Sequence, residues 1–153
     1  CKQHGADEGF VYPTGKLDKD QQKELSAKIK ELTGGMGANV VYDPVGDSYS
    51  EPCIRATAWD GRYLVIGFAA GEIPKIPINL ALLKGMKIVG VFWGAWVGMN
   101  PAENKKNFEE LFKLHSEGKI NPEVSDSFSL DDGAKAIAHL KDRKAKGKVI
   151  ITI

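Results

Sequence analysis

The feature that most constrains the fold of this chain is the alternation of short, continuous apolar runs with longer amphipathic stretches. The apolar runs fall at residues 39–43, 63–67 and 86–93, and the stretch at 18–33 carries leucine and isoleucine at helical spacing. Continuous apolar strands are typical of sheets buried on both faces, and helices of about 10–15 residues between them are typical of right-handed βαβ crossovers. The sequence therefore predicts an α/β fold with a parallel sheet.

Turn and cap residues divide the rest of the chain. Pro13, Thr14 and Gly15 close a brief strand at residues 10–12, and Ser48 with Glu51 is a capping-box pattern. A helix is predicted from that box to Asp60 and Gly61, followed by an extended loop at 73–77 and a short helix from its cap Asn79 to Leu83.

The last third of the chain predicts two helices and two strands. The first helix has the apolar stripe Phe108, Leu111, Phe112 and His115 and is closed by Gly118. A strand around Phe128 comes next, then a helix that begins at Asp131 with Ala134, Ile137 and Ala138 facing inward, and a final strand at 149–153.

Composition excludes several classes of function. The 21 lysines and arginines balance 20 acidic residues, so the net charge of +1 gives no electrostatic reason to expect nucleic acid or an anionic membrane as partner. No apolar run approaches the roughly 20 residues that a membrane helix needs. The two cysteines, Cys1 and Cys53, are too few for a disulfide framework or a zinc site, which predicts a cytoplasmic location. The chain opens without methionine, which predicts that it is a fragment.

Glycines and histidines provide weak candidates for a ligand site. The run Gly34, Gly35, Met36 and Gly37 follows a predicted helix and precedes a strand, whereas a dinucleotide-binding loop follows a strand and opens a helix. We therefore interpret this run as a helix stop with a tight turn. The three histidines are scattered and do not form a metal-ligand set; no metal site is predicted.

The segments that follow the predicted parallel strands are better candidates. In doubly wound sheets ligands bind beyond the carboxyl ends of the strands, and glycine there allows close approach of a ligand to the backbone. These segments are residues 43–46, 66–69 and 91–94. Each has a second interpretation, since tight strand-to-helix turns need such residues anyway and the aromatic residues at 92 and 93 could fill the core.

The order and spacing of these pieces bring a family resemblance. Residues 40–46, 61–74, 79–83, 89–94 and 147–150 together resemble the quinone oxidoreductase (zeta-crystallin-like), zinc-independent branch of the medium-chain dehydrogenase/reductase superfamily, over essentially the whole chain. Asp47 is a departure, because the family often has a second glycine there.

The resemblance implies a partial Rossmann fold, a doubly wound parallel sheet that lacks its first two strands. In the usual order 3-2-1-4-5-6, the chain supplies strand 3 near Tyr12 and strands 4, 5 and 6 at Val41, Val65 and Val89. Residues 1–120 are expected to form an incomplete nucleotide-binding domain. Residues 121–153 are expected to be a strand-helix-strand segment that returns to the catalytic domain, which lies upstream together with the glycine-rich phosphate loop.

The resemblance also implies contacts to NADPH. Tyr12 matches a tyrosine near the adenosine 2′-phosphate, and Gly147 and Lys148 match a late contact. Pro44, Val45 and Gly46 match a turn that borders the cofactor. Two further segments match those that flank the nicotinamide: Ile66, Gly67, Phe68 and Ala69; and Val91, Phe92 and Trp93. No catalytic side chain is assigned, because the cofactor itself performs hydride transfer. For Tyr12, packing on the core is an equally good interpretation.

The family's activity is the reduction of a quinone or another electron-poor carbonyl compound by NADPH. An enoyl-thioester reductase of the same superfamily is the alternative, and the isolated chain could be an inactive assembly or binding module. Relatives dimerise through strand 6, here residues 86–93, so a homodimer is expected through this apolar edge, with further association through residues 39–43.

Overall fold

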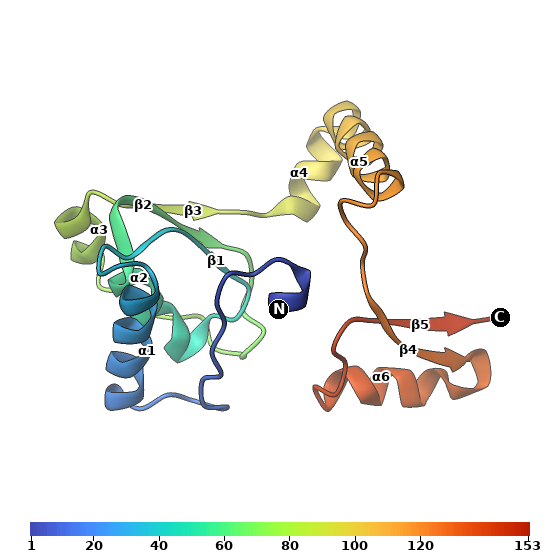
Figure 1. The fold of residues 1–153 in the computed structure, drawn as a ribbon, viewed down its shortest axis with the longest axis horizontal. Helices are drawn as coiled ribbons and strands as arrows, with labels where there is room; N and C mark the ends of the chain where they lie inside the picture. Colours follow the sequence, from blue (N-terminus) through green and yellow to red (C-terminus); the bar gives the residue numbers. More distant parts are fainter. The chain divides into compact units, whose positions relative to one another are not determined.

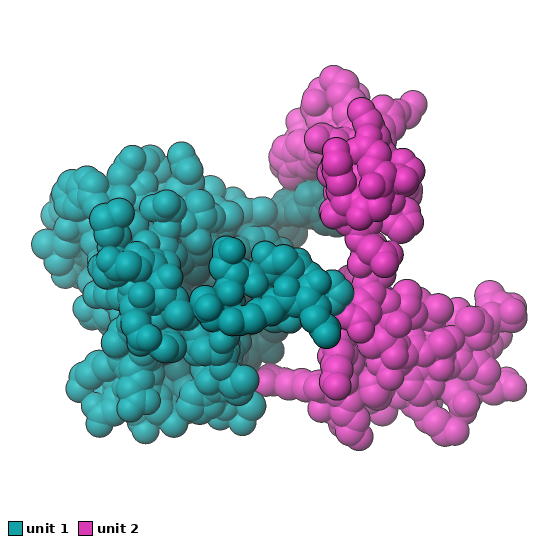
Figure 2. All heavy atoms as spheres, in the orientation of Figure 1, with its two compact units in different colours: residues 1–94 teal, residues 95–153 magenta.

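The computed structural model describes all 153 residues, which divide into two compact units at residues 1–94 and 95–153 (Figure 2). Each unit contains its own parallel sheet. No helix in either unit combines the length and the apolar character needed to cross a membrane.

The sheet of unit 1 has three parallel strands in the order β1-β2-β3: β1 (Ala38–Asp43), β2 (Thr57–Val65) and β3 (Lys87–Gly90) (Figure 1). Val41 pairs with Tyr63, and Tyr63 pairs with Ile88. The predicted α/β class with parallel strands is therefore confirmed. β3 ends before the predicted residue 93, because Trp93 opens the helix α4 (Trp93–Met99).

Helix α1 (Lys19–Leu32) begins where local chemistry favours a helix start. The Asp18 carboxylate accepts hydrogen bonds from the amides of Asp20 and Gln21, both at 2.9 Å, and Gln21 Oε1 accepts from the Asp18 amide at 2.9 Å. This reciprocal capping box satisfies amides that the first helical turn leaves free. Gly34 and Gly35 follow the helix with φ of 63° and 84°, so the interpretation of these glycines as a helix stop is confirmed.

The capping box predicted at Ser48 is wrong. A 3-10 turn, η2 (Asp47–Tyr49), leads into α2 (Ser50–Arg55), and neither has a side-chain cap. The Ser48 hydroxyl is occupied elsewhere, since it accepts a hydrogen bond from the Leu17 amide at 2.8 Å. The helix also ends before Asp60, because Thr57 already pairs with Ala38. Asp60 has a φ of 56° inside β2, so the residues read as a helix end belong to an irregular stretch of strand.

The strand predicted at residues 10–12 is also wrong, because these residues pair with no strand. The other edge of β1 is free, but residues 10–12 do not join it. The segment is instead held by its aromatic rings: Phe10 packs beside the buried cluster of Leu17, Leu25 and Tyr49.

The main apolar cluster of unit 1 joins its sheet to α2 and to α3 (Asn79–Lys84). It contains Ile54, Tyr63, Leu80 and Met86. The short helix predicted from Asn79 is confirmed, although the residue in the cap position is Ile78 and makes no side-chain cap bond. Residues 73–77 form neither helix nor strand, as predicted.

Unit 2 has a helix and a two-stranded parallel sheet with its crossover. They are α5 (Pro101–Ser116), β4 (Val124–Ser129), the turn η3 (Leu130–Asp132), α6 (Gly133–Lys141) and β5 (Lys148–Thr152). The inward face predicted for α6 is wrong. Ala134, Ile137 and Ala138 are exposed, and Ala136 is the buried residue. The helix is rotated so that Ala136 is buried and the His139 ring lies 5.7 Å from the Phe128 ring of β4.

Candidate functional site

The segments that follow β1 and β2 lie together at the carboxyl end of the unit 1 sheet. The Asp43 carbonyl accepts from the Ile66 amide at 3.0 Å, and the amides of Ala69 and Ala70 donate to the carbonyls of Pro44 and Val45 at 3.0 and 2.9 Å. Two of the three segments predicted from the sequence are therefore bound to each other by their backbones.

A buried carboxylate fixes the first of these segments. Asp43 is 6% exposed, and one of its oxygens accepts from the amides of Val45 at 2.8 Å and Gly46 at 3.0 Å. Its other oxygen accepts from the Ser50 hydroxyl at 2.9 Å and from the Tyr63 hydroxyl. Burial, reinforced by this bond to the carboxylate, raises the pKa of Tyr63 above its usual range. The tyrosine therefore stays protonated and donates.

Gly46 is the point where the two segments come closest. Its φ is 75°, and a Cβ there would lie 2.8 Å from Phe68 Cδ1. Both the backbone conformation and the space require glycine. Pro44 and Phe68 are exposed beside this contact. A Cβ added at Gly67 would have only the Pro44 carbonyl oxygen within 4 Å.

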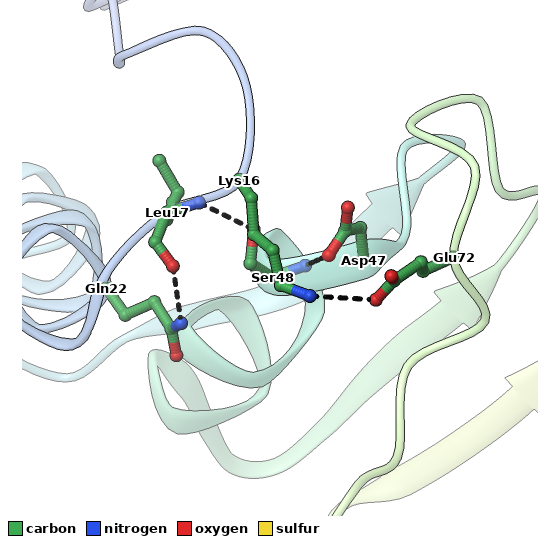
Figure 3. Close-up of polar contacts among 6 residues, drawn as sticks. All are labelled: Lys16, Leu17, Gln22, Asp47, Ser48 and Glu72. Atoms are coloured by element: carbon green, nitrogen blue, oxygen red, sulfur yellow. Dashed lines mark hydrogen bonds and ion pairs between the residues drawn. The ribbon is translucent and has the colours of Figure 1, made fainter.

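Residues 46–50 are five successive residues that contact several separate parts of the site. After Gly46, the Asp47 amide donates to the Glu72 carbonyl at 3.1 Å, and Ser48 holds Leu17 as described (Figure 3). Asp47 has a φ of 52°, a backbone conformation that glycine adopts more readily than other residues. We call residues 46–50 the anchor segment.

Tyr49 of the anchor segment connects Tyr12 to the same network. Its hydroxyl lies 2.9 Å from the Pro13 carbonyl and 2.7 Å from the Gly15 carbonyl, and its ring lies 5.1 Å from the Tyr12 ring. Tyr12 is 42% exposed and lines a pocket of about 420 Å³ beside α1. It therefore combines packing on a buried ring with an accessible face.

An ion pair closes this part of the site. Lys16 Nζ lies 3.0 Å from Glu72 Oε2, and this hydrogen bond, together with the carboxylate charges of Glu72 and Asp47, raises the pKa of Lys16 (Figure 3). Gln22 adds a bond to the Leu17 carbonyl at 3.0 Å. Residues 13–17 are thus tied to the loop after β2.

The third predicted segment follows β3. The Val91 amide donates to the Val65 carbonyl at 2.9 Å, which places Val91 beside the end of β2. Phe92 is 80% exposed and Trp93 is 57% exposed, so neither fills the core of its unit. A flat apolar surface is therefore available at the carboxyl end of β3.

Gly147 and Lys148, the remaining predicted residues, lie in unit 2. The Gly147 amide donates to Ser125 Oγ at 3.0 Å, and the Lys148 amide donates to the Glu123 carbonyl at 2.7 Å. The Ser125 hydroxyl donates to Asp126 at 2.6 Å and is the main cause of the lowered pKa of that carboxyl. His139 Nε2 lies 3.2 Å from Asp126 but is not aligned for a hydrogen bond.

Sequence reasoning missed the residues that support the site. An aspartate at the end of a strand, followed by Pro-Val-Gly, is a signal for a side-chain turn and could have identified Asp43. No sequence signal pairs Tyr49 with residues 13–15 or Ser125 with Gly147, since each pair is far apart in the chain. No group of three or more histidine, cysteine, aspartate or glutamate residues is placed to hold a metal ion.

The parallel sheet with glycine-containing turns at its carboxyl end is typical of doubly wound α/β folds, which bind ligands at that edge. Residues 4–151 match the family model described as zinc-binding dehydrogenase. The chain is 37% identical to the quinone oxidoreductase-like protein 2 homolog of Nematostella vectensis over 85% of its length, and 35% identical to quinone oxidoreductase-like protein 2 of Rattus norvegicus over 100%. It spans only 36% and 42% of these relatives.

A solved mycobacterial protein complexed with NADPH has the same fold, with a TM-score of 0.81 at 23% identity over 99% of this chain and 45% of that one. The chain belongs to the zinc-binding dehydrogenase family, and within it to the zinc-independent, quinone oxidoreductase-like branch. The predicted family is thereby confirmed.

Proposed function

We propose that the protein carrying this chain transfers hydride from NADPH to a quinone or a similar electron-poor carbonyl compound. The observation that supports this proposal is the meeting of the β1 and β2 end segments at one edge of the sheet, around a glycine that cannot carry a side chain. The membership of the chain in an oxidoreductase family supports it independently.

The residues present fit a nicotinamide cofactor in part. Pro44, Val45, Gly46 and the segment 66–69 would border the nicotinamide half, where Gly46 and Gly67 let the cofactor approach the backbone. Val91, Phe92 and Trp93 would provide apolar contact on the other side, and Asp43 would hold the first turn in place. The bound cofactor supplies the hydride, and the chain binds, orients and excludes water.

Two more distant groups of residues complete the proposed cofactor contacts. Tyr12 would lie near the adenosine 2′-phosphate, held by Tyr49 and by the bonds to residues 13–15. Gly147 and Lys148 would add a late contact from unit 2, positioned by Ser125.

The isolated chain should bind NADPH weakly, with a dissociation constant above roughly 1 mM. The chain has no helix opened by a glycine-rich phosphate loop, and amides at such a helix start are what hold a pyrophosphate. Micromolar binding in calorimetry would contradict this. On this proposal the isolated chain is an inactive binding module, and the enzymatic activity belongs to the protein that carries the chain.

Trp93→Ala in the longer protein tests the proposal, with Trp59→Ala as the matched control. Trp59 is 73% exposed and lies beside Gly85 near the amino end of β2, whereas the proposed site follows the carboxyl ends of the strands. We expect Trp93→Ala to weaken NADPH binding and turnover of 1,4-benzoquinone, and Trp59→Ala to change neither. Equal, unaffected cofactor kinetics in both variants would contradict the proposal. Turnover of an enoyl thioester but not of benzoquinone would favour the enoyl-reductase alternative.

We further propose that the protein is a homodimer through β3. Ile88 and Val89 are 39% and 38% exposed, and β3 has a strand partner on one side only. Pairing with a second copy would satisfy its free backbone groups. β1 is the other free edge and should allow further association. Light scattering should show a dimer or larger, and Val89→Lys should shift it toward monomer; a monomer at high concentration would contradict the proposal.

A further inference from the structure

A cleft of about 640 Å³ lies between α1 and α2, on elements that the proposed hydride transfer does not use. Four cationic side chains line it, Lys19, Lys23, Lys30 and Arg55, against the single carboxylate of Glu51. The whole chain has a net charge of only +1, so this is a local concentration of positive charge.

Ion pairs neutralise part of this charge. Arg55 binds Glu51 through Nε at 2.8 Å and through Nη2 at 2.6 Å, and Lys23 binds Asp20 at 2.8 Å. Lys19 and Lys30 form no ion pair. The cleft therefore keeps two lysines whose charge has no partner.

Lys84, at the end of α3, adds a third cation near Lys30 and Arg55. Its ammonium group donates to the Thr57 carbonyl at 2.6 Å. Burial, followed by the charges of Lys30 and Arg55, lowers the pKa of Lys84. Lys84 does not line the cleft, but its charge adds to the positive potential around Lys30 and Arg55, which a bound anion would relieve.

The charges on α1 are arranged by side. Glu24 and Glu31 line the pocket on the other flank of the helix, together with Lys28, which pairs with Glu31 at 2.8 Å. The flank that faces α2 has lysines and no acid of its own in the cleft. The two flanks of α1 therefore differ in charge, whereas a helix surface with no ligand to bind would be expected to mix both signs of charge.

Topology separates this cluster from the candidate cofactor site. Arg55 comes two residues before β2 begins at Thr57, and Lys84 comes three residues before β3 begins at Lys87. Both therefore lie at the amino ends of parallel strands, whereas the segments around Gly46, Gly67 and Val91 follow the carboxyl ends.

We propose that the cleft between α1 and α2 binds a small molecule that carries phosphate groups. Lys30 and Arg55 line the same cleft and lie near Lys84, and such a group of cations provides the charge density that a phosphate needs. Guanidinium and ammonium groups bind phosphate oxygens through charge-assisted hydrogen bonds. The volume is within the range of about 300–1,000 Å³ typical of small-ligand sites. This site is independent of the proposed hydride transfer.

Inorganic pyrophosphate is the probe, and amide shifts of the ¹⁵N-labelled 153-residue chain report where it binds. We expect saturable shifts in α1 and α2. Lys30→Gln combined with Arg55→Gln should weaken binding about tenfold or more, because it removes two charged hydrogen-bond donors to phosphate oxygens. Both side chains are exposed and should not be needed for folding, which circular dichroism would check.

Lys105→Gln combined with Lys113→Gln is the matched control, because it removes the same charge from α5 of unit 2. Its affinity should stay within about twofold of the parent chain. An equal loss in both double variants would show general charge attraction and overturn the proposal. So would shifts confined to residues 44–47 and 66–70, or no saturable shifts. Binding of a hexaglutamate peptide without binding of pyrophosphate would replace the small molecule with an acidic protein segment.

Discussion

Units 1 and 2 are both built from parallel strands and helices, but they are stabilised differently. All buried hydrophobic residues except Ala136 belong to unit 1. In unit 2, α5 has no buried residue, although Phe108, Leu111 and Phe112 follow a helical stripe. A parallel strand-helix-strand arrangement therefore does not by itself create a core.

Unit 2 depends instead on backbone pairing and on a few polar bonds between β4 and the start of β5. Its apolar side chains remain accessible: Phe112 and Ile137 are each 68% exposed, and Leu140 is 56% exposed. Exposed apolar surface of this kind marks interaction surfaces. Substitutions of buried side chains should therefore have the largest effect on the stability of unit 1, and substitutions that disturb the backbone should have the largest effect on the stability of unit 2.

The largest expected effect is from Ile54→Ala in unit 1. Ile54 is fully buried in the main cluster, so the cavity should lower the free energy of unfolding by about 2–5 kcal/mol. Ile137→Ala in unit 2 is the control and should change it by at most about 0.5 kcal/mol. Urea titration followed by circular dichroism measures both. A similar loss for the two variants would remove the contrast between the units.

Gly147→Ala should have the next largest effect. A Cβ at Gly147 would lie 2.5 Å from the Glu123 carbonyl oxygen, so β4 and β5 must separate, at about 1–3 kcal/mol. The control is Gly133→Ala, where the nearest atom is 3.7 Å away and alanine favours the first turn of α6. Hydrogen exchange of β5 amides should rise in the first variant only. Unchanged exchange would mean that this contact does not hold unit 2 together.

Tyr49→Phe should have a smaller effect, because it removes one hydroxyl and keeps the ring. Loss of its bonds to residues 13–15 should cost about 0.5–1.5 kcal/mol and speed exchange of the Lys16 and Leu17 amides. Tyr42→Phe is the control, since Tyr42 is 67% exposed and its hydroxyl makes no hydrogen bond. Equal exchange in the two variants would show that the ring contact alone positions Tyr12.

At neutral pH the smallest expected effect comes from Cys53, because its contribution to stability changes only above about pH 9. Burial, and then the charge of Asp43, raises the pKa of this thiol from 9.0 to about 12. The unfolded chain loses the proton first as pH rises, so this contribution to stability is complete below about pH 9 and is lost between about pH 9 and pH 12. At pH 8.5 iodoacetamide should modify the exposed Cys1 far faster than Cys53; equal rates would show that the interior of unit 1 opens readily.

The apolar runs predicted the sheet of unit 1 because Val41 of β1 and Tyr63 and Val65 of β2 pack in its main apolar cluster. Prediction failed where the outcome depended on partners distant in the sequence. Residues 10–12 have strand-like composition but pair with no strand, and Ser48 looks like a cap although Leu17 uses its hydroxyl. Ile137 reads as inward because an amphipathic pattern gives a stripe but not the surface that the stripe meets.

The candidate site was predictable where strand ends determine position. The segments at 44–46 and 66–69 meet because parallel neighbouring strands end at the same edge. The contact between the rings of Tyr12 and Tyr49 could not be predicted from the sequence, because α1 and β1 separate these residues in the chain. The roles of all these residues toward a cofactor stay predictions.

The anchor segment has a consequence for how chain length can vary in evolution. Residues 46–50 bind the loop after β2, the turn at 13–17 and Asp43 within five successive positions. An insertion or deletion there would shift every later contact by one residue and break several at once. The stretch at 73–78 has no regular structure and much exposed surface. Insertions and deletions among homologues should therefore accumulate in that loop and be absent from the anchor segment.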